Sequence, residues 1–249
     1  VSYLQYKKPG SSSWLSYTSG TTIASTATNG QYQFRAVDKA GNVSDTQTIY
    51  LDSAAPTGTI KNSSGTAISG YTGGAFSYTA TDTGSGVSYL QYKTPGSSSW
   101  TTYSSGTTIS ASATNGLYQF RAVDNAGNTS AVSSIYLDTA IPTGKITDSN
   151  GTTVTTTTNK AFKYTASDGL SGIAYMQYKK PNSTVWETYA AGTLIQTTDT
   201  NGIYRFRAFD NAGNESETVM ICLDTVKPTG TLYGGTSTVA SGGKTNANY

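Results

Sequence analysis

The feature of this sequence that most restricts its fold is a repeat with a period of 86 residues. Val1, Val87 and Ile173 open three matching segments. Residues 1–55 agree with residues 87–141 at 39 of 55 positions, without a gap. Such a period is too long for a solenoid turn or a propeller blade, and it suits a small domain with its own core. The sequence therefore predicts a tandem array of similar domains.

One motif recurs almost unchanged, at residues 29–42, 115–128 and 201–214. Each copy opens with Asn-Gly, a strong signal for a tight turn because both residues tolerate positive φ. The next residues alternate, so Tyr32 and Phe34 project to one face of a strand and Arg35 to the other. The motif therefore predicts a central strand with one buried face, and we expect Arg35 to point outward and pack its stem on the sheet.

The stretch 56–141 shows about seven short strands separated by turn signals, with no helical periodicity. This pattern predicts an all-β sandwich. The expected strands are 57–60, 75–80, 87–93, a partner strand carrying Trp100 and Tyr103, 107–112, the central strand after Asn115, and 133–137.

Three stretches carry a family resemblance: Gly84-Ser85-Gly86-Val87 with Tyr92, Trp100 and Tyr103; the motif at 115–128; and Leu137-Asp138-Thr139-Ala140-Ile141-Pro142. Together they resemble the bacterial immunoglobulin-like (Ig-like) repeats of large cell-surface and adhesin proteins. The resemblance implies tandem Ig-like β-sandwich domains with an 86-residue repeat, forming an elongated rod. Tyr118, two residues before Phe120, is similar to the tyrosine-corner position of immunoglobulin domains.

The family's usual phase places domain junctions at prolines such as Pro56. It predicts full domains at 56–141 and 142–227, a partial domain at 1–55 without its first strands, and the start of a fourth domain at 228–249. In the alternative phase the units start at Val1, Val87 and Ile173. Under the preferred phase, residues 1–55 have an open sheet edge and a half-open core.

Composition excludes several classes of function. The net charge is +2 with no run of Lys or Arg, so we expect no nucleic-acid partner. No apolar run reaches the length of a membrane span, so we expect no membrane insertion.

The chain has no histidine, which removes most general-base and transition-metal arrangements. Its one cysteine, Cys222, is expected to pack in a strand. Because Val1 lies inside a repeated motif, we expect a segment of a longer protein.

Calcium is the one cofactor that the sequence leaves open. Asp38, Asp124 and Asp210 suit the stabilisation of a turn, and a calcium ligand is the alternative for them. Calcium needs several converging oxygens, which the acidic residues near the junctions and loops supply if those loops meet. These calcium candidates are Asp52, Asp82, Asp138, Asp168 and Asp224.

Aromatic residues gather around one predicted hairpin in each repeat. They either stabilise the sheet as cross-strand pairs or form flat platforms for sugar rings. The candidate platform residues are Tyr6, Trp14, Tyr17, Tyr92, Trp100, Tyr103, Tyr178, Trp186 and Tyr189.

We find no paired catalytic carboxylates, phosphate loop or nucleophile elbow in the sequence, so we expect no enzyme and no catalytic residue. The leading hypothesis is a stalk or spacer on a bacterial cell surface or wall. It joins neighbouring Ig-like domains and holds an adhesive or catalytic end outward. One alternative is a module that binds a glycan or a host protein. The other is a self-assembling filament, in which residues 1–55 accept a strand from residues 228–249 of another copy.

Overall fold

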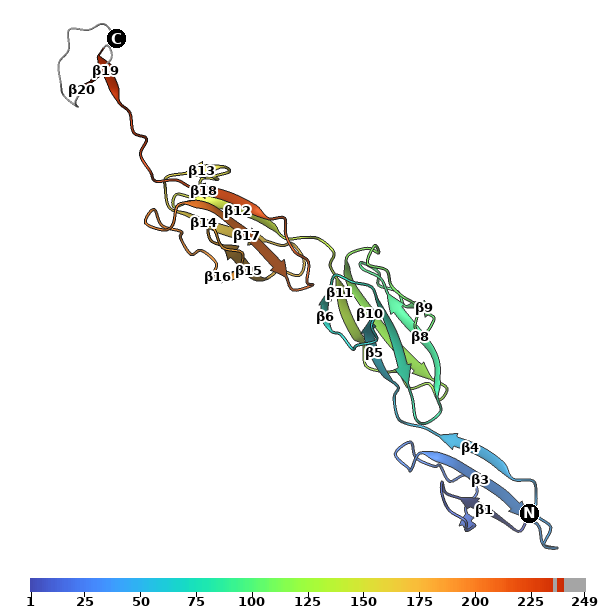
Figure 1. Ribbon diagram of the computed structural model, residues 1–249. Helices are drawn as coiled ribbons and strands as arrows, with labels where there is room; N and C mark the ends of the chain where they lie inside the picture. The colour runs from blue at the N-terminus through green and yellow to red at the C-terminus, as the bar shows by residue number, and fades with distance from the viewer. Residues whose placement is uncertain (235–236, 240–249) are drawn as a thin grey trace. The chain divides into compact units, whose positions relative to one another are not determined.

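The computed structural model describes residues 1–234 and 237–239, and all of their regular elements are β-strands (Figure 1). The chain divides into two compact units. Unit 1 contains residues 1–142, 168–174 and 209–215, and unit 2 contains residues 143–167, 175–208 and 216–249. No part of the described chain forms a long apolar helix of the kind that crosses a membrane. We call residues 1–55, 56–141 and 142–227 the first, second and third repeats.

The first repeat forms a single antiparallel sheet in unit 1, with the strand order β2-β1-β3-β4. On one face of this sheet, Phe34 lies opposite Tyr6 in the strand register. The rings of Tyr6, Tyr17 and Phe34 contact one another, with centroids 5.2–6.3 Å apart. The strands are β1 (Tyr3–Lys7), β2 (Leu15–Tyr17), β3 (Gly30–Val37) and β4 (Gln47–Leu51).

The second repeat, also in unit 1, is a two-layer sandwich. A two-stranded sheet, β5-β7, faces a five-stranded sheet, β6-β11-β10-β8-β9. The strands are β5 (Thr57–Asn62), β6 (Gly70–Thr72), β7 (Phe76–Thr81), β8 (Val87–Lys93), β9 (Thr101–Tyr103), β10 (Gly116–Asp124) and β11 (Ser133–Leu137). The buried core consists of Ile60, Phe76, Tyr78, Leu90, Tyr103, Tyr118, Phe120, Ala122, Ile135 and Leu137.

The sequence predicted most of these strands, and two differences have clear causes. Residues 107–112 do not form a strand, because only Ile109 pairs, in an isolated bridge to Phe76, before a turn at Ser110. Strand β6 was missed because it has three residues and starts at Gly70, whose φ is +77°. It pairs in parallel with β11, a long-range contact that no local pattern reports.

The repeated motif folds as the resemblance predicts. The Tyr118 hydroxyl donates a hydrogen bond to the Thr114 carbonyl at 3.0 Å, and the first and third repeats have the same bond. This confirms the tyrosine corner. Gly116 has a φ of +133°, and a Cβ there would lie 2.8 Å from the Pro95 side chain, so the turn requires glycine.

The third repeat forms the corresponding sheets, β12-β14 and β13-β18-β17-β15-β16, and the hairpin β19-β20 comes after it in the chain. The strands are β12 (Thr143–Asp148), β13 (Thr157–Thr158), β14 (Phe162–Ser167), β15 (Ile173–Lys179), β16 (Glu187–Tyr189), β17 (Gly202–Asp210), β18 (Val219–Leu223), β19 (Leu232–Gly234) and β20 (Ser237–Val239). Cys222 is a partly buried residue of β18. Residues 235–236 and 240–249, which belong to the predicted donor segment 228–249, lie outside the described residues.

Candidate functional site

The most prominent surface feature is a tryptophan ring flanked by two cations, which we call the cation–tryptophan strip. In the second repeat, Lys93 Nζ lies 4.8 Å and Arg121 Cζ 4.3 Å from the centre of the Trp100 ring. The other repeats have the same arrangement, with distances of 4.0–4.9 Å. The equivalent residues are Lys7, Trp14 and Arg35 in the first repeat and Lys179, Trp186 and Arg207 in the third.

Strand alternation places this strip on the outer face of the five-stranded sheet. Leu90 and Phe120 point into the core, so Gln91, Lys93 and Arg121 point away from it. Arg121 lies opposite Gln91 in the register, and its Nε donates a hydrogen bond to Gln91 Oε1 at 2.8 Å. The outward position predicted for the arginines is confirmed.

The tyrosines of the candidate platform lie on the opposite face from the tryptophan. Tyr92 stacks on Phe120 at 6.1 Å, and Tyr103 meets the same ring edge-on at 5.2 Å. Tyr103 is only 5% exposed, and its hydroxyl accepts a hydrogen bond from the Tyr78 backbone N–H at 2.9 Å. Burial raises the pKa of Tyr103. A ligand on the outer face therefore meets Trp100 but not these two tyrosines, and Tyr178 and Tyr189 pack on Phe206 in the same way.

The outer face carries an aromatic pair that the sequence did not reveal. Tyr71 on β6 stacks on Tyr136 on β11, with ring centres 5.3 Å apart and planes 28° apart. Tyr71 is 38% exposed. The pair was missed because it depends on the short parallel strand β6.

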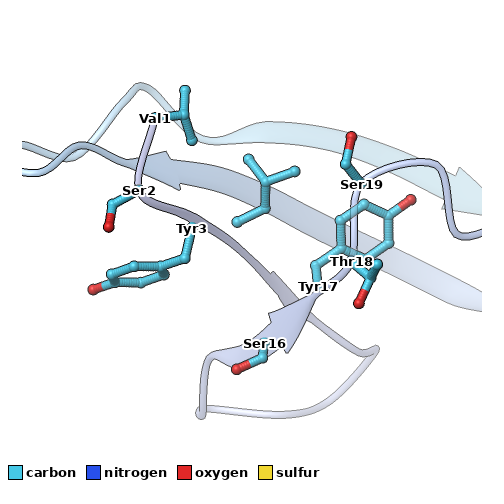
Figure 2. A pocket seen from close by; sticks show the side chains of 8 residues that line it. Val1, Ser2, Tyr3, Ser16, Tyr17, Thr18 and Ser19 are labelled. Carbon is cyan, nitrogen blue, oxygen red and sulfur yellow. The ribbon is translucent and has the colours of Figure 1, made fainter.

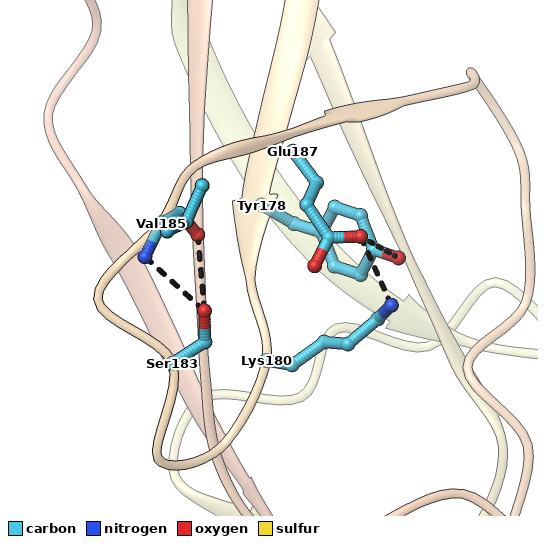
Figure 3. A network of polar contacts seen from close by, with 5 residues as sticks. All are labelled: Tyr178, Lys180, Ser183, Val185 and Glu187. Carbon is cyan, nitrogen blue, oxygen red and sulfur yellow. Dashed lines mark hydrogen bonds and ion pairs between the residues drawn. The ribbon is translucent and has the colours of Figure 1, made fainter.

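The third repeat departs from the other two in its charges. Arg205 stands where the second repeat has Gln119, and Glu187 stands where it has Thr101. Glu187 forms an ion pair with Lys180, whose Nζ donates a hydrogen bond to it at 2.9 Å, and contacts the Tyr178 hydroxyl at 3.5 Å (Figure 3). The added acid is therefore balanced by a neighbouring lysine.

The aspartates of the central motif act as turn residues. Asp124 Oδ1 accepts hydrogen bonds from the backbone N–H groups of Ala126 and Asn128, and its Oδ2 accepts one from Asn128 Nδ2. Asp38 and Asp210 make the same three bonds in their own turns. Hydrogen bonds from Asn42, first from its side chain, lower the pKa of Asp38. The predicted turn role is confirmed.

A different aspartate, Asp52, joins the end of the first repeat to loops of the second, all within unit 1. Its Oδ2 accepts a hydrogen bond from the Ser85 backbone N–H at 2.6 Å. Its backbone carbonyl accepts one from Asn128 Nδ2 at 3.0 Å. The fit is close, since a Cβ on Gly84 would lie 2.3 Å from Asp52 Oδ2. Hydrogen bonds from Ser85 lower the pKa of Asp52. We call this arrangement the aspartate clamp.

Unit 1 contains a second aspartate clamp. Asp138 Oδ2 accepts a hydrogen bond from the Ser171 backbone N–H at 2.9 Å, and the Asp138 carbonyl accepts one from Asn214 Nδ2 at 2.8 Å. Asp138 is fully buried. The sequence singled out Asp52 and Asp138 because they precede prolines, but the partner asparagine lies 76 residues further along the chain and could not be inferred.

The clamps bring together most of the predicted calcium candidates. Carboxylate oxygens of three aspartates come within 4.8 Å of one another in each of two groups, while Asp224 belongs to no such group in the described part of the chain. Most of these carboxylates already accept hydrogen bonds from backbone N–H groups. The clusters therefore hold loops in place without an ion. Calcium binding therefore stays a prediction. The groups are Asp52, Asp82 and Asp124, and Asp138, Asp168 and Asp210.

The comparisons with known proteins agree with this architecture. Residues 5–53 match the family model of the bacterial Ig-like domain. The chain carries a bacterial Ig-like domain. The second and third repeats carry the same motifs at the 86-residue spacing, on the same strands. No curated protein matches the chain.

Several solved structures resemble the Ig-like chain at low identity. Fibronectin(III)-like modules of Clostridium thermocellum CbhA are 18% identical, over 66% of this chain and 92% of that one, with a TM-score of 0.34. The FN1–FN3 domains of chicken CNTN1 are 16% identical, over 89% and 88%, with a TM-score of 0.29. A tetra-tandem repeat in the extending region of a large adhesion protein is 16% identical, over 90% and 66%, with a TM-score of 0.25. These likenesses are too low to support a functional argument.

The Ig-like sheet of the first repeat has an accessible hollow beside its inner face. Val1, Leu4 and Tyr17 are among the residues that line this hollow of about 590 Å³ (Figure 2). A second hollow of about 200 Å³ lies over Phe34 and Ala36. In the second repeat the equivalent aromatic residues are covered by β5 and β7. The first hollow has a counterpart of about 360 Å³ beside Val87 and Leu90 of the second repeat, so only the hollow over Phe34 and Ala36 marks a core surface without a facing sheet in the described structure.

Proposed function

We propose that the chain is a non-enzymatic stalk or spacer segment of a bacterial cell-surface protein, placed outside the cell. Its domains are the partial domain 1–55, the full domains 56–141 and 142–227, and the start of a fourth at 228–249. In this role it holds an adhesive or catalytic end away from the cell wall. The observation that carries the proposal is the aspartate clamp at Asp52.

The clamp supports this role because it restrains the end of one repeat against the next. Two loops of the second repeat hold Asp52: the Ser85 loop binds its carboxylate and the Asn128 turn binds its carbonyl. A residue fixed from two directions loses most of its backbone freedom, so Asp52 does not behave as a flexible linker. Asp138 repeats these bonds in unit 1. A spacer needs restrained junctions, because a flexible one would not keep its ends apart.

The Ig-like sandwich fits a role without catalysis, since this fold is typically non-enzymatic. Low charge and many Ser and Thr residues suit an exposed extracellular surface. The function of such a scaffold must come from binding groups on its surface or from the repetition of its domains.

Small-angle X-ray scattering of the intact chain tests the spacer. We expect an elongated particle, with each full repeat adding about 30–40 Å, the length of strands of about eight to ten residues plus their turns. Replacing both clamps in Asp52→Ala/Asp138→Ala is expected to shorten the mean particle and broaden its size distribution. The matched control is Asp45→Ala/Asp199→Ala, at two aspartates outside the clamps. A compact wild-type particle would contradict the proposal.

A second candidate function is the binding of a glycan, and the cation–tryptophan strip favours it. Trp100 is a partly exposed aromatic ring on a sheet face that also carries Gln91 and the Tyr71–Tyr136 pair. Aromatic rings stack on sugar rings, and amides bind their hydroxyl groups. Titration of glycans against wild type and Trp100→Ala tests this function. A host protein is the other ligand class for the same face.

A third candidate is self-assembly, favoured by the hollow over Phe34 on the first repeat. The open inner face around Phe34 would accept a strand from residues 228–249 of another copy. Light scattering over a range of concentrations tests this. Oligomers lost on deletion of residues 228–249 would support it, and a strictly monomeric chain would exclude it.

A further inference from the structure

In the first and second repeats, two positive charges share one indole ring and no carboxylate balances them. Both Lys93 and Arg121 lie within 4.8 Å of the centre of Trp100. They therefore lie within a Debye length of each other, which is about 10 Å at 0.1 M salt. Neither forms an ion pair with any residue that the structure describes. The two like charges repel each other, and an anion bound close to both of them would relieve that repulsion.

In the first and second repeats, the strands that form this face carry no exposed acidic residue. The strands of the first repeat contain no Asp or Glu, and those of the second repeat's five-stranded sheet contain only Asp124, which is buried in a turn. In the third repeat, Glu187 is paired with Lys180, Arg205 adds a positive charge, and the exposed Glu215 adds a negative charge opposite Phe209. In the first and second repeats, the potential of the outer face is therefore positive although the whole chain carries a net charge of only +2.

The arginine of each strip is held in position before any ligand arrives. Arg121 Nε donates to Gln91 Oε1 at 2.8 Å, and the same glutamine–arginine bond is 2.9 Å long in each of the other repeats. This bond uses one edge of the guanidinium group and leaves the terminal N–H groups of Arg121 for a carboxylate or sulfate. A fixed arginine loses less entropy on binding than a mobile one.

The surroundings of the strip suit a sugar chain. In the strand register, Gln119 lies between Lys93 and Ser134, and Tyr136 lies between Leu117 and Tyr71. The cations thus continue into rows of amide, hydroxyl and aromatic groups on the outer face of the sheet. Such a surface offers stacking and hydrogen bonds to sugar rings next to the charges.

From these contacts we propose that the cation–tryptophan strip binds an acidic polysaccharide, one whose sugar rings carry carboxylate or sulfate groups. This inference rests on the second candidate function, glycan binding, and names the ligand class. Each repeat supplies one strip, so a long polyanion engages several strips of one chain and gains affinity through multivalency. Nucleic acid is disfavoured because two cations per repeat and a net charge of +2 give few phosphate contacts.

The chain has a built-in reporter for this binding. Its three tryptophans are Trp14, Trp100 and Trp186, one in each strip. Tryptophan fluorescence of the intact chain is titrated with dextran sulfate, with polygalacturonate and with neutral dextran. We expect a saturable change with one or both acidic polymers, weakening at least tenfold between 50 and 500 mM salt, and none with neutral dextran.

Two charge-matched variants decide where the polymer binds. Arg35→Gln/Arg121→Gln/Arg207→Gln removes three strip arginines, and affinity is expected to fall at least tenfold. Lys61→Gln/Lys145→Gln/Lys163→Gln removes three positive charges from β5, β12 and β14, and affinity is expected to change less than twofold. Circular dichroism checks that both variants keep the wild-type fold.

Each remaining outcome would overturn the inference. Equal losses in the two variants would show attraction by net charge alone. Binding of neutral dextran that survives the arginine changes would leave glycan binding intact and remove the acidic ligand. If duplex DNA bound as tightly as the polysaccharides, nucleic acid would replace the acidic polysaccharide as the proposed ligand class. No binding of any polymer would remove both the inference and the second candidate function.

Discussion

The first and second repeats have nearly the same sheet sequence but different cores. Phe120 is fully buried, whereas the equivalent Phe34 is only partly buried. By contrast, the strip is almost unchanged, with the arginine 4.0 Å from Trp14 in one repeat and 4.3 Å from Trp100 in the other. The comparison separates two kinds of structure. The strip forms between neighbouring strands of one sheet and is therefore present in both repeats. The burial of the central phenylalanine requires a second sheet packed on the first.

The physical reason is the cover supplied by β5 and β7. Phe76 and Tyr78 pack on Phe120, with ring centres 6.2 and 5.0 Å away. Tyr78 reaches this position because Gly58 has no side chain; a Cβ there would lie 1.8 Å from the tyrosine hydroxyl oxygen. The described sheet of the first repeat has no such cover over Phe34, which explains its greater exposure.

The largest expected difference is in the cost of removing the central phenylalanine. Phe120→Ala is expected to lower the free energy of unfolding of its repeat by about 3–5 kcal/mol, because it leaves a cavity in a closed core. Phe34→Ala is expected to cost at most about 1–2 kcal/mol, because its ring is partly solvated. Urea unfolding is followed in variants that keep only Trp100 or only Trp14. Phe206→Ala is the matched control for Phe120→Ala, and equal costs at 34 and 120 would refute the comparison.

Supplying the missing cover is expected to have the next largest effect. A copy of residues 56–86 fused to the amino terminus, directly before Val1, provides a β5–β7 pair at its natural spacing. Burial of Phe34 and its neighbours is expected to stabilise the first repeat by about 1.5–3 kcal/mol, measured through Trp14. The control carries Phe76→Ser and Tyr78→Ser in the added copy only. No difference between the two extensions would show that aromatic cover is not what the first repeat lacks.

The turn asparagines give a smaller contrast. Asn128 bonds both Asp124 and the Asp52 carbonyl, whereas Asn42 bonds only Asp38. Asn128→Ala is expected to cost about 1–2 kcal/mol and Asn42→Ala less, because only the first loses the clamp bond. Thermal unfolding with the single-tryptophan variants measures both. A larger cost at Asn42 would argue against the clamp.

Acid is expected to weaken the clamp. The pKa of Asp52 is lower in the folded state, so its ionised form stabilises the fold above the unfolded value of about 3.9. That contribution is lost as the pH falls through the lower folded value. Melting midpoints of wild type and Asp52→Asn should therefore differ at pH 7 and converge towards pH 2. A constant difference would mean that the carboxylate charge is not involved.

Calcium is expected to have the smallest effect. If the predicted site forms, 5 mM calcium raises the melting midpoint of wild type by about 1–3 °C, and excess EDTA reverses the change. Asp82→Asn is expected to remove the shift in the second repeat, and Asp45→Asn serves as control. An unchanged midpoint would eliminate the calcium prediction.

The strip and the clamp also differ in how much of them the sequence could predict. The outward direction of Arg121 followed from alternation along one strand, and the turn role of Asp124 followed from its Gly and Asn neighbours. The split between Trp100 and Tyr103 follows from the same alternation, because residues three apart in an extended strand point to opposite faces. The Tyr71–Tyr136 pair and the Asp52–Asn128 bond join residues that are 65 and 76 positions apart. Sequence patterns over a few residues do not predict such contacts.

By itself, the sequence determined the 86-residue repeat, the all-β Ig-like fold, most strands and the tyrosine corner. These features depend on side-chain alternation and turn chemistry, which act over a few residues. Only the tertiary structure decided which aromatic rings are buried, which aspartates meet and which cations share a ring. Burial depends on the second layer of a sandwich, the meeting of the aspartates on loops brought together, and the shared ring on the pairing of neighbouring strands in one sheet. The same residues, Phe34 and Phe120, therefore have different environments in one chain.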